Sequence, residues 1–364
     1  MTTADIAAFS NNVIAFASVV YVLAFLSHLV EWVLGRGVPI GAVGAESRGT
    51  AVSPASLVPR SARQTRPATA VPRGSATVAP PEAPFRDDDR TSSGDDPARL
   101  RVEKFARIGI SLTALAALLH LVALVSRGLG GDPVRVPWGN MYEFSLMATF
   151  AVSVFYLSLL RKYQLGWLGP VVTGFNVAIL MLAVLILYVP AGPLVPALDS
   201  YWLVIHVIAA ITATGAFTVG GMASLLFLIR QRAETRGKIP ATGYIARLPE
   251  SAVLDRVAYR MNAFGFPIWT FAALIAGPIW AQYAWGRYWG WDPKEVWAFI
   301  TWVVYAAYLH ARATAGWKGK ASAVIALIGL ATLLFNFVGI NFYFGDTSQH
   351  SYAISVVGAH SGLD

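Results

Sequence analysis

The stretch from Trp285 to Trp297, here called the tryptophan segment, combines residue types that could bind a large, flat and anionic ligand. It reads Trp-Gly-Arg-Tyr-Trp-Gly-Trp-Asp-Pro-Lys-Glu-Val-Trp, with four tryptophans and four charged residues. Indoles stack on flat rings, glycine lets such a ring approach the backbone, and Arg287 or Lys294 can pair with carboxylates. Single tryptophans at a membrane interface usually only anchor helices at headgroup depth. This segment is denser than such an anchor requires, so it predicts a binding site.

The second half of the segment also carries a helix-start signal. Asp292 can cap the helix, Pro293 suits its first position, and Glu295 completes a capping box. The free N–H groups and the positive dipole end of that helix favour an anion such as a carboxylate. The predicted ligand-binding residues of the segment are Trp285, Gly286, Trp289, Trp291, Asp292, Pro293, Lys294, Glu295 and Trp297.

Two histidines are expected at the same end of the molecule as the tryptophan segment. His206 lies near the outer end of an apolar run, and His350 lies ten residues beyond the last such run. Two imidazoles that converge on one aromatic surface could ligate a haem iron from both faces, since haem iron takes axial histidine. The alternative interpretation is that both are ordinary polar residues at a membrane interface.

His310 is expected far from this site, because 17 residues of helix separate it from Pro293 and correspond to about 26 Å. It is either a functional ionisable residue at membrane depth or an interfacial residue beside Arg312. His28 is expected at a similar depth, either as an axial partner or as a satisfied interfacial histidine. The other two histidines have no supporting context and are interpreted as structural or incidental: His120 and His360.

The elements that must position these residues are membrane helices. The chain is 56% hydrophobic and 13% charged, whereas about a quarter of the residues in soluble domains are charged. Apolar runs of roughly 20 residues recur, each long enough to cross a ~30 Å hydrocarbon layer. The fold class is therefore predicted to be all-α, in a polytopic membrane protein. Its eight expected spans are approximately Asn12–Leu34, Ile108–Val125, Met141–Leu160, Leu168–Tyr188, Leu203–Ile229, Phe264–Tyr283, Val296–His310 and Ala323–Ile340.

Three parts are expected along the chain: a first membrane helix at 1–34, a linker at 35–98 and a membrane core at 99–364. The linker is rich in Pro, Ala, Ser and Arg, cannot bury enough apolar surface to fold, and is predicted to be disordered. Outside the linker, the loops on one side of the membrane carry twelve Lys and Arg residues, and the loops on the other side carry four. This bias predicts a cytoplasmic linker, with the tryptophan segment and C-terminal segment extracytoplasmic. The net charge of +8 could suggest nucleic acid in a soluble protein, but in this membrane protein we expect the lipid bilayer, and no nucleic acid, as partner.

The tryptophan segment resembles the tryptophan-rich signature of the haem-handling membrane proteins of cytochrome c maturation. Within that group, the chain is most similar to the CcsA/ResC branch, named CcsB in some bacteria. The further pieces that carry the likeness are Pro137–Glu143, His206, Tyr308–Arg312 and Phe337–Tyr352. The likeness covers roughly residues 104 to 355. The chain departs from the family at Ser348 and Gln349, where Gly-Leu commonly precedes the histidine.

The resemblance implies a protein of the bacterial plasma membrane that exports or holds b-type haem and promotes its thioether attachment to apocytochrome c. His206 and His350 are then the axial ligands of an external haem, and His310 belongs to an inner haem site. The implied partners are a ResB-type membrane protein, within a cytochrome c haem lyase (synthase) complex, and a thioredoxin-like reductant. The family gives no catalytic residue beyond those that position haem. Because the chain has no cysteine, the reacting thiols must belong to the apocytochrome.

Other functions fit parts of the same sequence. A haem-delivery subunit that passes haem to a separate chaperone shares the tryptophan signature and the flanking histidines, but such subunits usually have six spans. A membrane transporter or channel with an aromatic vestibule belongs to a different class, and the chain lacks the repeated halves that would favour it. A non-catalytic scaffold leaves the tryptophans and histidines unexplained.

Overall fold

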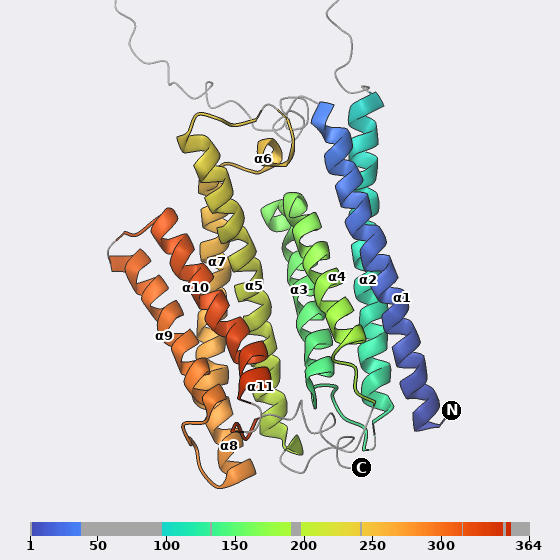
Figure 1. The fold of residues 1–364 in the computed structure, drawn as a ribbon, viewed down its shortest axis with the longest axis vertical. Coiled ribbons are helices and arrows are strands. Elements are labelled where there is room, and N and C mark those ends of the chain that lie inside the picture. The colour runs from blue at the N-terminus through green and yellow to red at the C-terminus, as the bar shows by residue number, and fades with distance from the viewer. Residues whose placement is uncertain are drawn as a thin grey trace, which may run out of the picture.

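The computed structural model of this chain describes residues 2–37, 97–131, 133–190, 198–240, 242–314, 316–344 and 347–350. Every regular element in these residues is helical, and the long helices run side by side along one axis (Figure 1). By length and composition, seven helical stretches of the described residues are suited to cross a membrane. The prediction of an all-α, multi-pass membrane protein is confirmed.

The first four long helices form one side of the bundle. They are α1 (Thr3–Leu34), α2 (Pro97–Leu129), α3 (Met141–Tyr163) and α4 (Gly169–Leu185). Helices α1 and α2 pack along one another at the edge of the molecule, with α3 and α4 next to them (Figure 1). Small and large side chains alternate in their shared core, which includes Ala17, Tyr21, Ala116, Leu146 and Leu180. Close approach of the backbones at the alanines favours this packing in a membrane.

The remaining helices form the other side of the bundle, and two pairs of them are joined by a π-helical turn. They are α5 (Tyr201–Thr235), the short α6 (Tyr244–Arg247), α7 (Ser251–Phe271), α8 (Gly277–Trp285), α9 (Pro293–Thr314), α10 (Lys320–Leu334) and α11 (Ile340–Tyr343). The turn η8 (Ala272–Ala276) joins α7 to α8, and the turn η9 (Phe335–Gly339) joins α10 to α11. Helix α9 lies at the edge opposite to α1 and α2 (Figure 1).

Seven of the predicted spans lie within helices, several of which are longer than their apolar runs, whereas the predicted span Leu168–Tyr188 extends three residues past the end of α4 at Leu185. Helix α1 begins at Thr3 because Thr2 and Asp5 form a capping box ahead of the apolar run. Helices α2 and α7 likewise begin 11 and 13 residues before the predicted apolar runs, and these added turns carry charged residues such as Arg101 and Asp255. Helix α9, the predicted span Val296–His310, has 22 residues, but Trp, Tyr and His make it less apolar than the other seven stretches. Most of the predicted linker, at 38–96, lies outside the described residues.

The two ends of the bundle differ in what they carry. The tryptophan segment, the first residues of α1, and helix α11 lie at one end, here called the tryptophan end (Figure 1). The last residues of α1, the first residues of α2, and helix α6 lie at the opposite end, here called the linker end (Figure 1). This arrangement is the one expected for an even number of crossings between the start of α1 and the end of α11.

Candidate functional site

A cavity opens at the tryptophan end between the two sides of the bundle. Its empty volume is about 1150 Å³, counting the part open to solvent. Its walls come from the residues before α3 and from α5, η8, α8, the tryptophan segment, η9 and α11. The lining is mainly apolar, with a few convergent polar side chains that include His206, Lys294, Asn341 and His350.

His206 enters the cavity from α5, and its ring is oriented by the π-helical turn η8. Its Nδ1 donates a hydrogen bond of 2.9 Å to the carbonyl oxygen of Ala272, which also accepts from the N–H of Gly277 across the π turn. Pro278 follows directly and has no N–H to donate to the turn before it, so the regular helical ladder is interrupted there. The Ala272 carbonyl oxygen therefore accepts two hydrogen bonds, one from the Gly277 N–H within the π turn and one from His206. Single π turns are common at functional sites for this kind of reason.

His350 reaches the same cavity from the C-terminal side, and the tryptophan segment holds it there. Its Nδ1 donates to Oδ2 of Asp292 at 2.9 Å. Asp292 also accepts from the Ser348 hydroxyl at 2.8 Å and from the Gln349 N–H at 2.7 Å. One carboxylate therefore accepts from three successive residues, 348–350, and fixes the histidine-bearing segment.

The two cations of the tryptophan segment strengthen this attachment. Arg287 donates from Nη2 to the Gln349 side chain at 2.6 Å. Lys294 donates from Nζ to the His350 carbonyl oxygen at 3.2 Å and to Oδ1 of Asn341 at 3.1 Å. Both cations therefore have partners within the protein itself. The departure from the family pattern at Ser348 and Gln349 places hydrogen-bonding side chains at the two positions that contact Asp292 and Arg287.

Asp292 remains ionised in this position. Burial raises its pKa, but the hydrogen bond and charge of His350 and the hydrogen bonds from Ser348 and Gln349 lower it more, to a pKa of about 2. The same residue caps α9 as predicted, since its Oδ2 accepts from the Lys294 N–H at 3.0 Å. Glu295 completes the capping box by accepting from the N–H of Asp292 at 3.1 Å. Helix α9 begins at Pro293, as the capping pattern predicts.

The imidazole rings of His206 and His350 are therefore oriented in the same way. In each ring Nδ1 is engaged by an acceptor, and among the described residues neither Nε2 has a hydrogen-bond partner. Metal-ligating histidines almost always donate their second ring N–H to a carboxylate or carbonyl, which fixes the tautomer and leaves the other nitrogen for the metal. Each imidazole is therefore oriented so that its Nε2 could ligate a metal.

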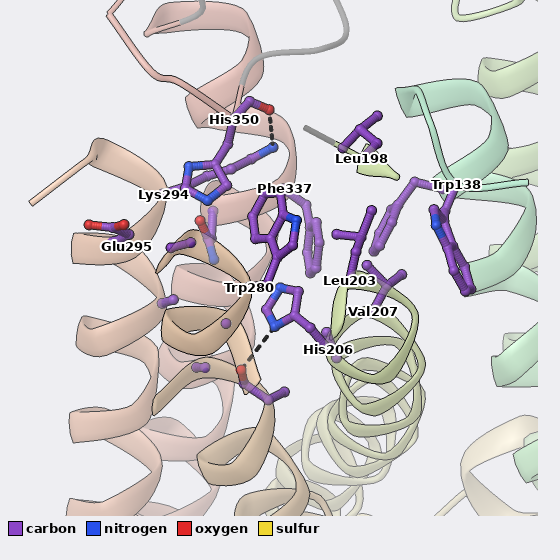
Figure 2. A pocket seen from close by; sticks show the side chains of 18 of the residues that line it. Trp138, Leu198, Leu203, His206, Val207, Trp280, Lys294, Glu295, Phe337 and His350 are labelled. Atoms are coloured by element: carbon purple, nitrogen blue, oxygen red, sulfur yellow. Dashed lines mark hydrogen bonds between the residues drawn. The ribbon is translucent and has the colours of Figure 1, made fainter. Parts of the chain in front are cut away.

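The indole of Trp280 lies between the two imidazoles (Figure 2). Its ring centroid is 6.0 Å from that of His206, with an interplanar angle of 12°, and 5.4 Å from that of His350. Trp285 packs edge-on against both neighbours, at 4.8 Å from Trp280 and 4.6 Å from His350. An aromatic cluster thus separates the two histidines.

The four tryptophans of the segment take different positions. Trp289 lines the cavity together with Tyr288, Lys294 and Glu295. Trp285 lies behind His350, as described above. Trp291 is 72% exposed and adopts a left-handed backbone conformation, with φ of 56°. Trp297 packs against Phe335 at 4.2 Å. Gly286, at φ 73°, ends α8 in the left-handed region that glycine adopts without strain.

The remaining histidines lie elsewhere. His310 is exposed on α9, about 26 Å along the helix from Pro293, in the direction of the linker end. His28 is buried on α1, with Nδ1 3.2 Å from Oε2 of Glu31. Because α1 and α9 lie at opposite edges (Figure 1), His28 and His310 of one chain cannot ligate one iron. His120 is buried between the rings of Tyr21 and Phe150, and His360 lies outside the described residues.

Several residues of the site were not predicted from the sequence. Trp280 and Ala272 belong to the predicted span Phe264–Tyr283 and appeared there only as apolar residues. The cavity wall before α3 contains the residues 137–143 that resemble the family, and a buried ion pair that the sequence does not predict supports it. Glu143, 1% exposed, accepts from Arg127 at 3.0 Å, from Arg135 at 2.8 Å and from the Gly139 N–H at 2.8 Å. From the sequence alone, Arg127 and Arg135 are only charges of a connection between spans.

The chain is similar to known proteins of one kind. The family model described as "Cytochrome C assembly protein" matches residues 138–345, which include the tryptophan segment, His206 and His310. The cytochrome c biogenesis protein CcsA of Guillardia theta is 33% identical over 268 residues, covering 69% of this chain and 87% of the relative. CcsA of Prochlorococcus marinus is 34% identical over 265 residues, covering 66% and 82%. CcsA of Gloeobacter violaceus is 32% identical over 303 residues, covering 69% and 88%.

Proposed function

We propose that this chain, which belongs to the cytochrome c assembly protein family and therefore has a role in cytochrome c biogenesis, holds haem as its cargo between His206 and His350. The observation that carries the proposal is the matched preparation of the two imidazoles, each with Nδ1 bonded and Nε2 left for a metal. The mainly apolar walls of the cavity suit the faces of a porphyrin. Tyr288 and Trp289 are the aromatic side chains that the tryptophan segment contributes to those walls.

The proposed reaction is the addition of two thiols to the two vinyl groups of haem. Each cysteine S–H of an apocytochrome Cys-x-x-Cys-His segment adds across one vinyl C=C, so that a C–S bond forms and the proton is kept on the neighbouring carbon. This addition needs no external oxidant or reductant. The chain contributes proximity, because a cargo held by two rigid ligands presents its edge to the thiols in a fixed orientation. The histidine of the apocytochrome then replaces one of the two ligands.

The position of His310 favours a membrane partner. The ring is exposed on α9, at the edge of the bundle, and no other histidine of the described residues lies at that edge. We propose that a second ligand for an inner haem comes from a ResB-type membrane protein docked against α9. The charge bias of the connections supports an orientation in the bacterial plasma membrane with the tryptophan end extracytoplasmic.

The test is the visible and electron paramagnetic resonance spectrum of the purified protein, produced together with a ResB-type partner. Wild type is expected to carry low-spin, six-coordinate haem. The His206→Ala and His350→Ala variants are expected to convert that haem to high spin or to lose it. His310→Ala is the matched control, because its ring lies far from the cavity and its loss should leave the outer low-spin signal in place. Because an inner haem at His310 would also be low-spin, the decisive protein is the His206→Ala, His350→Ala, His310→Ala triple variant, and a low-spin signal that persists in it contradicts the assignment.

A further inference from the structure

We infer that the indole of Trp280 is a movable barrier between the two histidines, which must leave the gap before both rings can ligate one iron. This inference rests on the proposed function. Trp280 is 2% exposed and lies on α8, four residues after the carbonyl-bearing turn η8 ends. Its contacts with His206 on one side and His350 on the other place it in the gap (Figure 2).

The distances do not allow the indole and the iron to share this gap. Two imidazoles that ligate one metal hold their nitrogens about 2 Å from it on opposite sides, and therefore about 4 Å apart. A flat ring between them needs about 3.5–4.0 Å of contact distance on each side. The indole of Trp280 therefore excludes an iron held by both histidines, and the described arrangement is the closed state of the site.

The surroundings of Trp280 provide room for the ring to move. The cavity beside it opens to solvent, and the residues that line its wall next to Trp280 are small: Ala273, Gly277 and Ala281. The helix that carries it has only nine residues and joins the rest of the span through a π turn. A change of side-chain rotamer can thus carry the indole into the cavity without unfolding α8. The displaced ring would then lie where it can contact the face of the cargo.

A purely structural role for Trp280 makes the opposite prediction. If the indole only supports His206 by stacking on it, its removal should loosen the ligand and weaken haem binding, with no faster uptake. A barrier, in contrast, restricts uptake, because only the minor open state binds, and the apparent rate falls in proportion to the population of that state. The two roles therefore differ in the sign of the effect on the association rate.

The experiment mixes the haem-free full-length protein with haem and follows low-spin haem formation by stopped-flow absorbance. Trp280→Ala is expected to raise the association rate constant by about tenfold or more, because open states are commonly populated at 10% or less. Trp280→Phe, which keeps a smaller ring and guards against misfolding, should fall between Ala and wild type. Trp202→Ala is the matched control: it truncates another tryptophan of the same cluster that does not line the cavity. Unchanged or slower uptake, with faster haem loss, overturns the barrier.

A second measurement separates this inference from the proposed function. Diethyl pyrocarbonate modifies accessible imidazoles, and mass spectrometry reports the modification of His206 in the haem-free protein. Trp280→Ala should accelerate that modification by about the same factor as haem uptake, whereas Trp202→Ala should not. If no variant, including wild type, forms haem that depends on His206 and His350, the proposed function fails. An unchanged rate of His206 modification in Trp280→Ala then shows separately that the indole is no barrier.

Discussion

His206 and His350 donate through the same ring nitrogen, but to acceptors of different charge. His206 faces the neutral carbonyl of Ala272, and His350 faces the carboxylate of Asp292. A carboxylate partner makes an imidazole a stronger electron donor than a carbonyl partner does. The two proposed axial ligands are thus unequal, and Asp292 controls the stronger one. Asp292 also caps α9, so this electronic control and the start of the helix depend on one side chain.

The Asp292→Asn variant tests this inequality. The amide keeps the size of the side chain but lacks the charge, so His350 becomes a weaker donor and ferric haem is stabilised less. We expect the midpoint potential of the bound haem to rise by about 60 mV, which equals a tenfold change in relative affinity for one electron. Potentiometric titration measures it. Asp199→Asn is the control, since Asp199 is exposed and lies just before α5. Equal shifts in both variants contradict the role of Asp292.

The attachment of residues 348–350 has a defined pH dependence. Asp292 has a pKa of about 2 in the folded protein, below its ordinary value of 3.8. Its contribution to stability is therefore fully present above about pH 3.8 and is lost as the pH falls through about 2. Hydrogen exchange at the Gln349 amide, corrected for intrinsic rates, should show protection down to about pH 4 and a loss below it. Loss of protection already between pH 6 and 5 excludes Asp292 as its cause.

Elements defined by local signals were predictable from the sequence, and elements defined by packing were not. The start of α9 follows from Asp292, Pro293 and Glu295, which lie within one turn, and the membrane helices follow from the lengths of apolar runs. The turns η8 and η9 interrupt such runs without changing their composition. Only Pro278 signals η8 in the sequence, and nothing local shows that the carbonyl of Ala272 meets a side chain of α5. The position of Trp280 beside the two histidines could not be predicted either, because it too depends on how distant helices pack.

The same limit applies to the candidate site. His206 and His350 were expected at one end of the molecule, and the structure brings them to one cavity. The partners of Arg287 and Lys294 could not be foreseen, because a cation in a loop pairs equally well with a ligand or with a distant part of its own chain. Gln349 and Asn341 become neighbours of these cations only after α10 has packed into the bundle.

Gly277→Ala tests the π turn that positions His206. An added Cβ would lie 3.1 Å from the carbonyl oxygen of Ala272 and 3.1 Å from Cε1 of His206. Such crowding costs about 1–3 kcal/mol or displaces the ring. We expect a smaller low-spin fraction of bound haem in the electron paramagnetic resonance spectrum. Gly166→Ala is the matched control, because a Cβ there meets no atom within 4 Å. A full low-spin fraction in Gly277→Ala contradicts the positioning role of the turn.

At the scale of the whole molecule, the bundle separates its two proposed metal regions. The cavity lies at the tryptophan end, between the two sides of the bundle, and His310 lies toward the other end of α9. His310 is exposed at the edge formed by α9, whereas α1 and α2, with the buried His28, form the opposite edge (Figure 1). A partner that supplies the second ligand of an iron bound by His310 must therefore dock on the α9 edge. The α1 edge then faces lipid.

This geometry predicts where cross-links to a partner should form. A photoreactive residue in place of Val303, which is 44% exposed on α9, should cross-link to a co-produced ResB-type protein. The same residue in place of Val19, which is 57% exposed on α1, is the matched control and should give no such product. His310→Ala should keep the cross-link but lower the haem content of the complex. Cross-links from Val19 alone place the partner at the other edge and contradict the proposal.

The hydrogen bond between Asp292 and His350 joins residues that are 58 positions apart in the chain. During synthesis, α5 and the tryptophan segment are made before α10 and α11, which must pack into the bundle before His350 can reach Asp292. A partly inserted chain therefore presents His206 without its counterpart and cannot hold an iron from both faces. If the proposed function holds, the order of the helices along the chain thus delays haem capture until insertion of the bundle is complete, and a nascent protein cannot load its cargo too early.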